Sequence, residues 1–214
     1  MGAAVNRFGK SQRTELTRIF SELADLIHAN NMERIVGVGP SVYPYTIALK
    51  RAYVQRYGKR ARQLSVVNLG RLGEGLGEAT SSIIMADKLI KPLQRRLSRN
   101  SNANSLLLED VIVAGWGVSN IARVFDNLRI PNMTAALLQV RPKPHLTFSP
   151  HYTGADVERS DSLHRAIFLS RGRRFSDSTG KKVIRPPVQW AAKMREIHNE
   201  LREIANSVPR KEQK

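Results

Sequence analysis

The chain has 214 residues, 41% of them hydrophobic, which fits one globular domain with a substantial core. It contains no cysteine, which excludes disulfides, thiolate metal sites and cysteine nucleophiles. Its 35 Lys and Arg residues outnumber 18 Asp and Glu, and the resulting charge of +17 indicates a polyanionic ligand or partner. No apolar run reaches the roughly 18 residues of a membrane span, and the start lacks a secretory signal, so we expect a cytoplasmic protein.

The first part of the chain predicts alternating helices and strands. Apolar residues recur at helical spacing over 14–30, and a short apolar strand follows at 35–38. A tight loop then leads into a helix over about 46–57, and "QLSVVNLG" predicts a second strand. This order of helix, strand, helix and strand favours a parallel sheet with right-handed crossovers.

A different kind of segment, over 70–104, separates this part from the next. It combines a glycine-rich stretch with a basic, polar one, and we interpret it as a functional or flexible loop that leaves the sheet. Residues 106–129 then predict a strand, a turn and a helix, and 133–142 predict a further strand.

The remainder is irregular until a final helix. Residues 142–186 are rich in prolines, histidines and charges, and predict a cap with one strand at 165–172. Pro187 is placed to begin the C-terminal helix. The apolar seam of that helix, over 188–206, is typical of packing on the parent domain, and a contact with a partner protein or a second copy is the alternative.

The main functional signal is the stretch "LLLEDVIVAGWGVSN", residues 106–120. An adjacent acid pair, Glu109 and Asp110, interrupts an apolar strand, and a Gly-Trp-Gly turn follows. This turn approximates the G-x-G-x-x-G of dinucleotide-binding folds, although Asn120 stands where the third glycine would pack the helix against the strand. A Rossmann-type NAD(P)-binding oxidoreductase is therefore one interpretation.

A second interpretation fits more of these residues. "LLLEDVIVAG" resembles the phosphoribosyl-pyrophosphate (PRPP) motif of type I phosphoribosyltransferases: apolar residues, Glu/Asp-Asp, two apolar residues, two small ones and Gly. In that family the acid pair holds the ribose hydroxyls, and the next loop holds the 5′-phosphate. The resemblance implies an α/β fold with a parallel-sheet, Rossmann-like core, helices on both faces, and a small irregular hood and C-terminal helix. The implied 5′-phosphate loop comprises Val113, Ala114, Gly115, Trp116, Gly117, Val118 and Ser119.

Elementary chemistry supports these roles independently of the family. A ribose diol can donate two hydrogen bonds to carboxylates. A phosphate is stabilised by free backbone amides and by the positive end of a helix dipole. Glu109 and Asp110 meet the first requirement, and residues 114–120, with Ser119 as a hydroxyl donor, meet the second.

The resemblance also covers the layout of neighbouring segments. The loop over 70–104 takes the place of the family's flexible catalytic loop, with Arg71 joining Glu109 and Asp110 as a catalytic candidate. Segments 1–33 and 142–186 take the place of the hood, which makes 1–186 a single domain followed by a helix and basic tail over 187–214. Mg²⁺ is implied as a cofactor held mainly through the ligand, with no direct protein ligand. The implied pyrophosphate loop comprises Gly39, Pro40, Ser41, Val42 and Tyr43.

Basic residues gather in clusters that contain few acids. Such clusters suit contact with the phosphate backbone of RNA or DNA without sequence readout, and solvated helix faces are the competing explanation. The nucleic-acid candidates are Lys50, Arg51, Arg56, Lys59, Arg60, Arg62, Arg95 and Arg96.

The sequence as a whole predicts a phosphoribosyltransferase-like protein. It would bind a ribose-5-phosphate or PRPP-type ligand with Mg²⁺ and, if active, transfer the phosphoribosyl group to a base or another nitrogen acceptor. The alternatives are a non-catalytic RNA- or DNA-binding regulator or effector subunit on the same fold and, third, the oxidoreductase. Association through the helix over 188–206, with a protein partner or a second copy, completes the expectations.

Overall fold

The architecture comes from a computed structural model. It describes residues 8–39, 41–58, 64–69, 93–95, 97, 102–112, 116–139, 148–156, 163, 174–176, 182–184 and 187–211. Most of the predicted loop over 70–104 and the predicted strand at 165–172 lie outside the described residues. No helix in the described part is long and apolar enough to cross a membrane.

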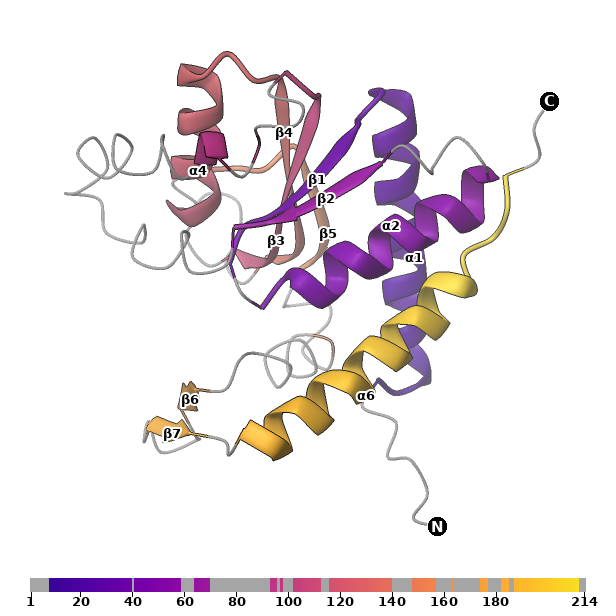
Figure 1. Ribbon diagram of the computed structural model, residues 1–214. Helices are drawn as coiled ribbons and strands as arrows, with labels where there is room; N and C mark the ends of the chain where they lie inside the picture. The colour runs from indigo at the N-terminus through magenta and orange to yellow at the C-terminus, as the bar shows by residue number, and fades with distance from the viewer. Residues whose placement is uncertain are drawn as a thin grey trace, which may run out of the picture.

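Five parallel strands form the central sheet, in the order β2-β1-β3-β4-β5 (Figure 1). The sheet confirms the predicted α/β class, and four of its strands are the ones predicted. The fifth, β5, falls in the region expected to be irregular. The strands are β1 (Arg34–Gly37), β2 (Ser65–Asn68), β3 (Ser105–Ile112), β4 (Asn132–Gln139) and β5 (Tyr152–Asp156).

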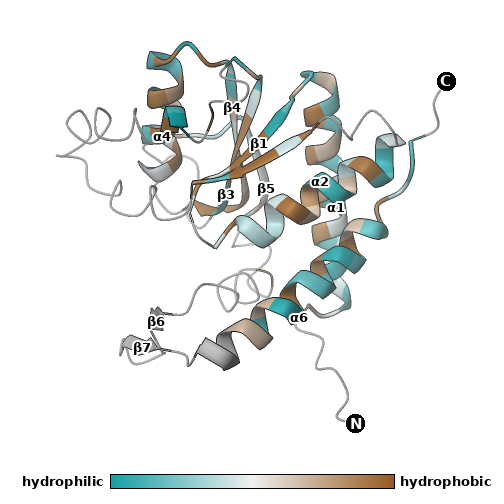
Figure 2. Ribbon diagram, in the orientation of Figure 1, coloured by the Kyte–Doolittle hydropathy of each residue, from teal (hydrophilic) through white to brown (hydrophobic). Residues whose placement is uncertain are grey.

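Helices cover both faces of this sheet, as predicted. On one face α1 (Lys10–Ala29), α2 (Tyr43–Tyr57) and α6 (Pro187–Asn206) share a hydrophobic core with Leu106 and Leu108 of β3. On the other, α4 (Trp116–Asn127) packs its apolar side chains with Leu107 of β3. Because successive strand residues point to opposite faces, the apolar run of β3 supplies both cores. Figure 2 shows hydrophobic residues concentrated in the strands, whereas the helices carry both hydrophobic and hydrophilic residues.

The terminal helices are integral to the first core. Leu16, Ile19 and Phe20 of α1 are fully buried, and so is Ile197 of α6. The backbone amide of Phe8 donates a 3.0 Å hydrogen bond to the Glu200 carboxylate of α6. Residues expected in the hood and in the C-terminal appendage therefore build the core, while the division at residue 187 stays a prediction.

A small antiparallel hairpin precedes α6. It pairs β6 (Arg174–Ser176) with β7 (Lys182–Ile184), with Phe175 opposite Val183. In Figure 1 the hairpin lies apart from the main sheet, next to the first turn of α6. The α6 helix begins at Pro187, as the sequence predicts.

An ion-pair cluster fastens α1 to α2. Arg56 donates two hydrogen bonds to the carboxylate of Asp25, at 2.7 and 2.8 Å, and the Tyr57 hydroxyl donates a third. Lys211 lies 3.5 Å from the same carboxylate. The hydrogen bonds from Arg56 are the main cause that lowers the pKa of Asp25 from 3.8 to about 2.

Replacing Asp25 with Asn should destabilise the protein at pH 7 by about 1 kcal/mol, because the Asp25 side chain is 37% exposed and its ion pairs are screened. Since folding lowers the pKa of this carboxyl, its stabilisation is complete above pH 3.8 and is lost as the pH falls toward 2. Urea denaturation of both proteins should therefore show a difference at pH 7 that closes near pH 2. A constant difference across this range would contradict the assignment.

Candidate ligand site at the carboxyl edge of the sheet

The connections of β1 and β3 leave the sheet in opposite directions. These strands are neighbours, with Gly37 of β1 paired with Leu108 of β3. The chain continues from β1 into α2 on one face and from β3 into α4 on the other. In open α/β sheets such a switch point leaves a crevice outside the carboxyl ends of the strands, where ligands bind. Both predicted ligand loops follow these two strands.

The turn after β1 holds the first turn of α2 close to the sheet. A Cβ on Gly37 would lie 2.9 Å from Val42 Cγ1 and 3.1 Å from Thr46 Cγ2, so only glycine permits this approach. The Val42 carbonyl accepts the amides of Tyr45 and Thr46, which starts the helix. Of the predicted pyrophosphate loop, residues 39 and 41–43 thus lie at the carboxyl end of β1, and Pro40 is outside the described residues.

The acid pair lies just beyond the last contact between β1 and β3. The Val38 amide donates a 2.8 Å hydrogen bond to the Leu108 carbonyl, and Glu109 and Asp110 follow. Glu109 is half-buried, whereas Asp110 is only 3% exposed and its Oδ1 accepts the Val111 amide at 3.0 Å. Val111 packs in the same core as Leu108, so the regular alternation of faces along β3 is broken at the acid pair.

Glu109 faces the first turn of α4. Its Oε1 lies 3.4 Å from the place that a Cβ on Gly117 would occupy. The first turn of α4 contains no acidic residue, so the positive end of the helix dipole adjoins the carboxylate without competition from its own side chains. A carboxylate and a helix N-terminus thus share one side of the crevice.

The implied 5′-phosphate loop is described only in its second part. Residues 116–119 form the first turn of α4. Val118, Ser119 and Asn120 are buried, at 0%, 7% and 5% exposure. Val113, Ala114 and Gly115 lie outside the described residues, as does the catalytic candidate Arg71.

The nucleic-acid candidates lie in different environments. Arg51 is exposed on α2, whereas Lys50 is half-buried and Arg95 is exposed on a short helical stretch. Arg56 is occupied by Asp25 and by the carbonyl of Pro209, so we interpret it as a structural residue. Binding of RNA or DNA stays a prediction from charge. The remaining candidates, Lys59, Arg60, Arg62 and Arg96, are outside the described residues.

Two polar residues at the same edge were missed by the sequence analysis. Gln139 ends β4 and is paired in register with Asp156, which ends β5. The Oδ1 atom of Asp156 is buried, and none of the described residues forms a hydrogen bond with it. Because β5 was not predicted, no sequence signal placed Asp156 beside the site.

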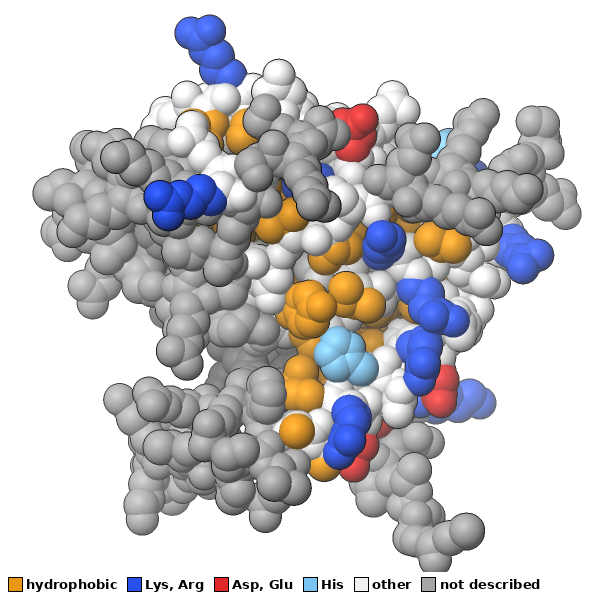
Figure 3. All heavy atoms as spheres, in the orientation of Figure 1, with side chains coloured by type: hydrophobic (Ala, Val, Ile, Leu, Met, Phe, Trp, Pro, Cys, Tyr) orange, Lys and Arg blue, Asp and Glu red, His pale blue; other side chains and the backbone are white. Residues whose placement is uncertain are grey.

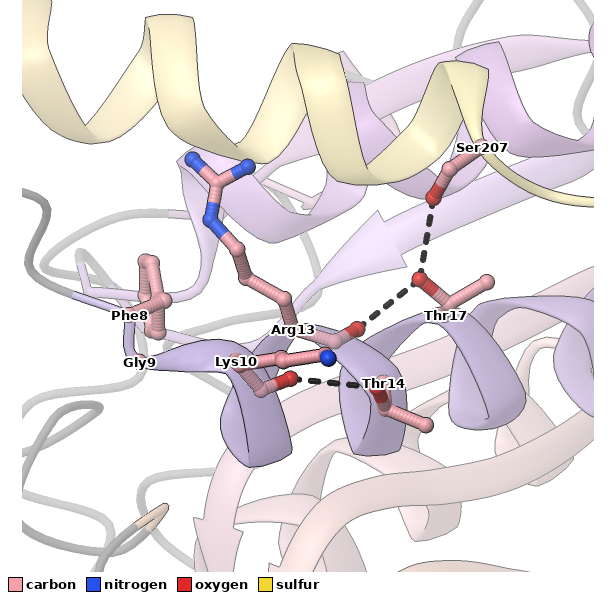
Figure 4. Close-up of a pocket in the computed structure, with 7 residues that line it drawn as sticks. All are labelled: Phe8, Gly9, Lys10, Arg13, Thr14, Thr17 and Ser207. Atoms are coloured by element: carbon pink, nitrogen blue, oxygen red, sulfur yellow. Dashed lines mark hydrogen bonds between the residues drawn. The ribbon is translucent and has the colours of Figure 1, made fainter.

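A hollow of about 620 Å³ lies away from the acid pair, between the start of α1 and Ser207 (Figure 4). The hydroxyls on its wall are already bonded within the protein. Thr14 donates to the Lys10 carbonyl, and Thr17 bonds the Arg13 carbonyl and the Ser207 hydroxyl. Arg13 pairs with Glu203 at 2.9 Å. We interpret this hollow as the seam between two packed helices.

Comparisons with known proteins point to one fold. No protein-family model matches the sequence, and no curated protein matches it. Among solved structures, an asparagine mutant from an analysis of an invariant aspartic acid in hypoxanthine phosphoribosyltransferases superposes with a TM-score of 0.50, at 15% identity, over 86% of this chain and 93% of that one. The chain has the phosphoribosyltransferase fold.

Two further neighbours carry the same enzyme name. The Trypanosoma cruzi enzyme gives a TM-score of 0.49 at 14% identity, over 86% of this chain and 91% of that one. The Schistosoma mansoni enzyme, in complex with IMP, gives a TM-score of 0.44 at 16% identity. The match covers 68% of this chain and 62% of the length of that enzyme. The described strands follow the order β2-β1-β3-β4-β5, whereas dinucleotide-binding folds have the order 3-2-1-4-5-6, so the oxidoreductase stays the third interpretation.

Proposed function

We propose that this protein binds a 5-phosphoribosyl ligand of the PRPP type at the crevice between β1 and β3. The observation that carries the proposal is the half-buried carboxylate of Glu109 against the first turn of α4, at the switch point of the sheet. A ribose phosphate needs a hydrogen-bond acceptor for its hydroxyls and, one sugar ring away, an anion site for its 5′-phosphate. The carboxylate and the helix N-terminus provide these two groups.

In this proposal the two carboxylates orient the ribose. Glu109 and Asp110 accept hydrogen bonds from the 2′- and 3′-hydroxyls, the first turn of α4 holds the 5′-phosphate, and the turn after β1 holds the pyrophosphate. The bond from ribose C1 to the pyrophosphate oxygen breaks, and a bond from C1 to an acceptor nitrogen forms. The acceptor nitrogen loses its proton to water, and pyrophosphate leaves with the electron pair of the broken bond. Fixed charges stabilise the oxocarbenium-like transition state of such a step.

A PRPP-type ligand would also carry Mg²⁺. This ion keeps several waters and binds to substrate phosphates. In this proposal the ion is held mainly through the phosphates of the ligand, with no direct protein ligand. Bound Mg²⁺ would neutralise charge on the departing pyrophosphate.

Isothermal titration with PRPP and Mg²⁺ tests the proposal. Each of two substitutions, Glu109→Gln and Asp110→Asn, should weaken binding at least about tenfold, since a hydrogen bond to a charged group contributes about 1.5–3 kcal/mol. Glu109→Gln should disturb the folding of the protein less than Asp110→Asn, because Glu109 is only half-buried. Asp126→Asn is the matched control, because Asp126 is an exposed carboxylate near the far end of α4.

Two outcomes would contradict the proposal. One is no binding of PRPP by the unmodified protein. The other is equal loss in the control variant and at the acid pair, which would show a general effect of charge. If PRPP binds, conversion with candidate nitrogen acceptors can be followed through pyrophosphate release.

A further inference from the structure

The α2 helix presents an apolar stripe to solvent. In the described part of the chain, the large hydrophobic side chains that stay exposed are Tyr43, Ile47 and Val54, at 41%, 39% and 37%. All three belong to α2, at spacings of four and seven residues, which places them on one side of the helix. An exposed apolar stripe is commonly a contact surface for another molecule.

A groove runs beside this stripe, between α2 and α6. It encloses about 220 Å³. The ring of His198 meets that of Tyr43 edge-on, with 6.1 Å between centroids. In Figure 3, hydrophobic side chains form a patch at the centre of this face, with Lys and Arg side chains beside it. The groove is lined by Pro44, Ile47, Ala48, Arg51, His198, Asn199 and Arg202.

The groove is positively charged and has no acid in its lining. The α2 sequence contains no Asp or Glu at all. On α6, Glu196 is exposed but does not line the groove, and Glu200 and Glu203 contact Phe8 and Arg13 at the α1 side. Among the residues that the structure describes, no acid therefore lines the groove to balance its two arginines.

Neutral partners hold the two arginines of the groove in place. Arg51 Nε donates a 2.6 Å hydrogen bond to the side-chain carbonyl of Asn206. Arg202 donates to the side-chain carbonyl of Asn199. An amide orients a guanidinium but leaves its charge intact, so both arginines keep donors for an acidic group.

We infer that the α2–α6 groove binds an acidic amphipathic helix of a partner protein. The stripe from Tyr43 to Val54 spans about 16 Å, or three helical turns, which suits apolar residues at i, i+4, i+7 and i+11 of a partner helix. Acidic residues flanking that apolar face would meet Arg51 and Arg202. Exposed Tyr and Arg side chains are the types that dominate binding energy at protein interfaces.

Two other occupants fit less well. A second copy bringing the same face would set its arginines near those of the first, which is unfavourable for an apolar contact. Single-stranded RNA would use the arginines and Tyr43, but the aliphatic side chains of Ile47 and Val54 offer it neither stacking nor charge. An acidic protein helix uses both the apolar and the basic parts of the surface.

A designed peptide provides the test. It is a helical 18-residue probe with Leu at i, i+4, i+7 and i+11 and Glu at the flanking positions, and its control carries Lys in place of every Glu. Fluorescence anisotropy should show the Glu peptide binding at least tenfold more tightly than the Lys peptide. Binding should weaken at least tenfold in Ile47→Asp and in Arg51→Glu, both of which alter exposed residues. Arg123→Glu, an exposed position on α4, is the matched control and should leave binding unchanged.

Other outcomes overturn the inference. If the two peptides bind equally tightly, or if Arg123→Glu weakens peptide binding as much as Arg51→Glu does, then the groove is not the binding site for an acidic helix. Tighter binding of a single-stranded RNA 12-mer, sensitive to Arg51→Glu but not to Ile47→Asp, makes the surface a phosphate site. A concentration-dependent dimer of the unmodified protein that Ile47→Asp dissociates makes it a self-association face. PRPP binding is measured separately, so failure here leaves the proposed ligand site intact.

Discussion

Replacing Gly117 with Asp should weaken PRPP binding by about 10- to 100-fold. Gly117 lies in the first turn of α4, and a Cβ there would sit 3.4 Å from Glu109 Oε1. An added carboxylate would place negative charge beside Glu109 and at the helix end that is proposed to hold the 5′-phosphate. Two like charges about 5 Å apart repel by about 3 kcal/mol at an effective dielectric of 20, and partial solvation reduces this to about 1.5–3 kcal/mol.

Gly117→Asn isolates the charge from the added volume. Asn has nearly the shape of Asp but carries no charge, so the difference between the two variants measures electrostatics alone. Titrations at low and high salt should show the Asp variant recovering part of its loss, because salt screens the repulsion. Equal affinities for the Asp and Asn variants would show that no anion binds at this helix end.

Much of the fold could be predicted from local patterns. The apolar runs predicted β1 to β4, and helical periodicity predicted α1, α2, α4 and α6. The first residue of a helix was harder to predict from the sequence. The α2 helix begins at Tyr43 rather than near Thr46, because its N-cap is Val42, which makes no side-chain cap and gives no sequence signal. The first turn of this helix therefore extends into the predicted pyrophosphate loop.

The elements that were missed depend on contacts between distant parts of the chain. The β5 strand has only five residues, but Arg18 of α1 donates a 2.6 Å hydrogen bond to the Gly154 carbonyl, and the Tyr152 hydroxyl donates to Glu22. Burial against α1 and the bond to Glu22 raise the pKa of Tyr152. Likewise, the pairing of Arg56 with Asp25, 31 positions apart, removes a cation that the sequence offered to nucleic acid.

The position of the acid pair in the chain could be predicted from the sequence, but its surroundings could not. The sequence placed Glu109 and Asp110 near the end of a strand and before a glycine turn. It could not tell that β1 stops pairing at Leu108, which opens one side of the pair, or that Glu109 faces Gly117. These two features follow from the register between β1 and β3 and from the position of α4 beside β3, and both depend on how the whole sheet is assembled.

Replacing Gly154 with Ala should give a large loss of stability, about 3 kcal/mol. A Cβ at this position in β5 would lie 2.7 Å from the Leu137 carbonyl oxygen and 2.8 Å from Ile19 Cγ2. The carbonyl belongs to the backbone of β4 and cannot turn aside, and Ile19 is fully buried in α1. Overpacking of a dense core typically costs about 1–3 kcal/mol, and a backbone clash places this site at the upper end.

Gly9→Ala is the matched control for this substitution. A Cβ on Gly9 meets only Gln12 Oε1, at 3.8 Å, and its φ of −63° suits alanine, so we expect a loss below about 1 kcal/mol. Urea denaturation followed by circular dichroism measures both variants. Equal, small losses would mean that α1 does not pack on β5 as closely as these distances require. Because Gly154 is not part of the acid pair, PRPP binding by the folded fraction of its Ala variant should stay unchanged, which separates the stability of the sheet from the chemistry at its carboxyl edge.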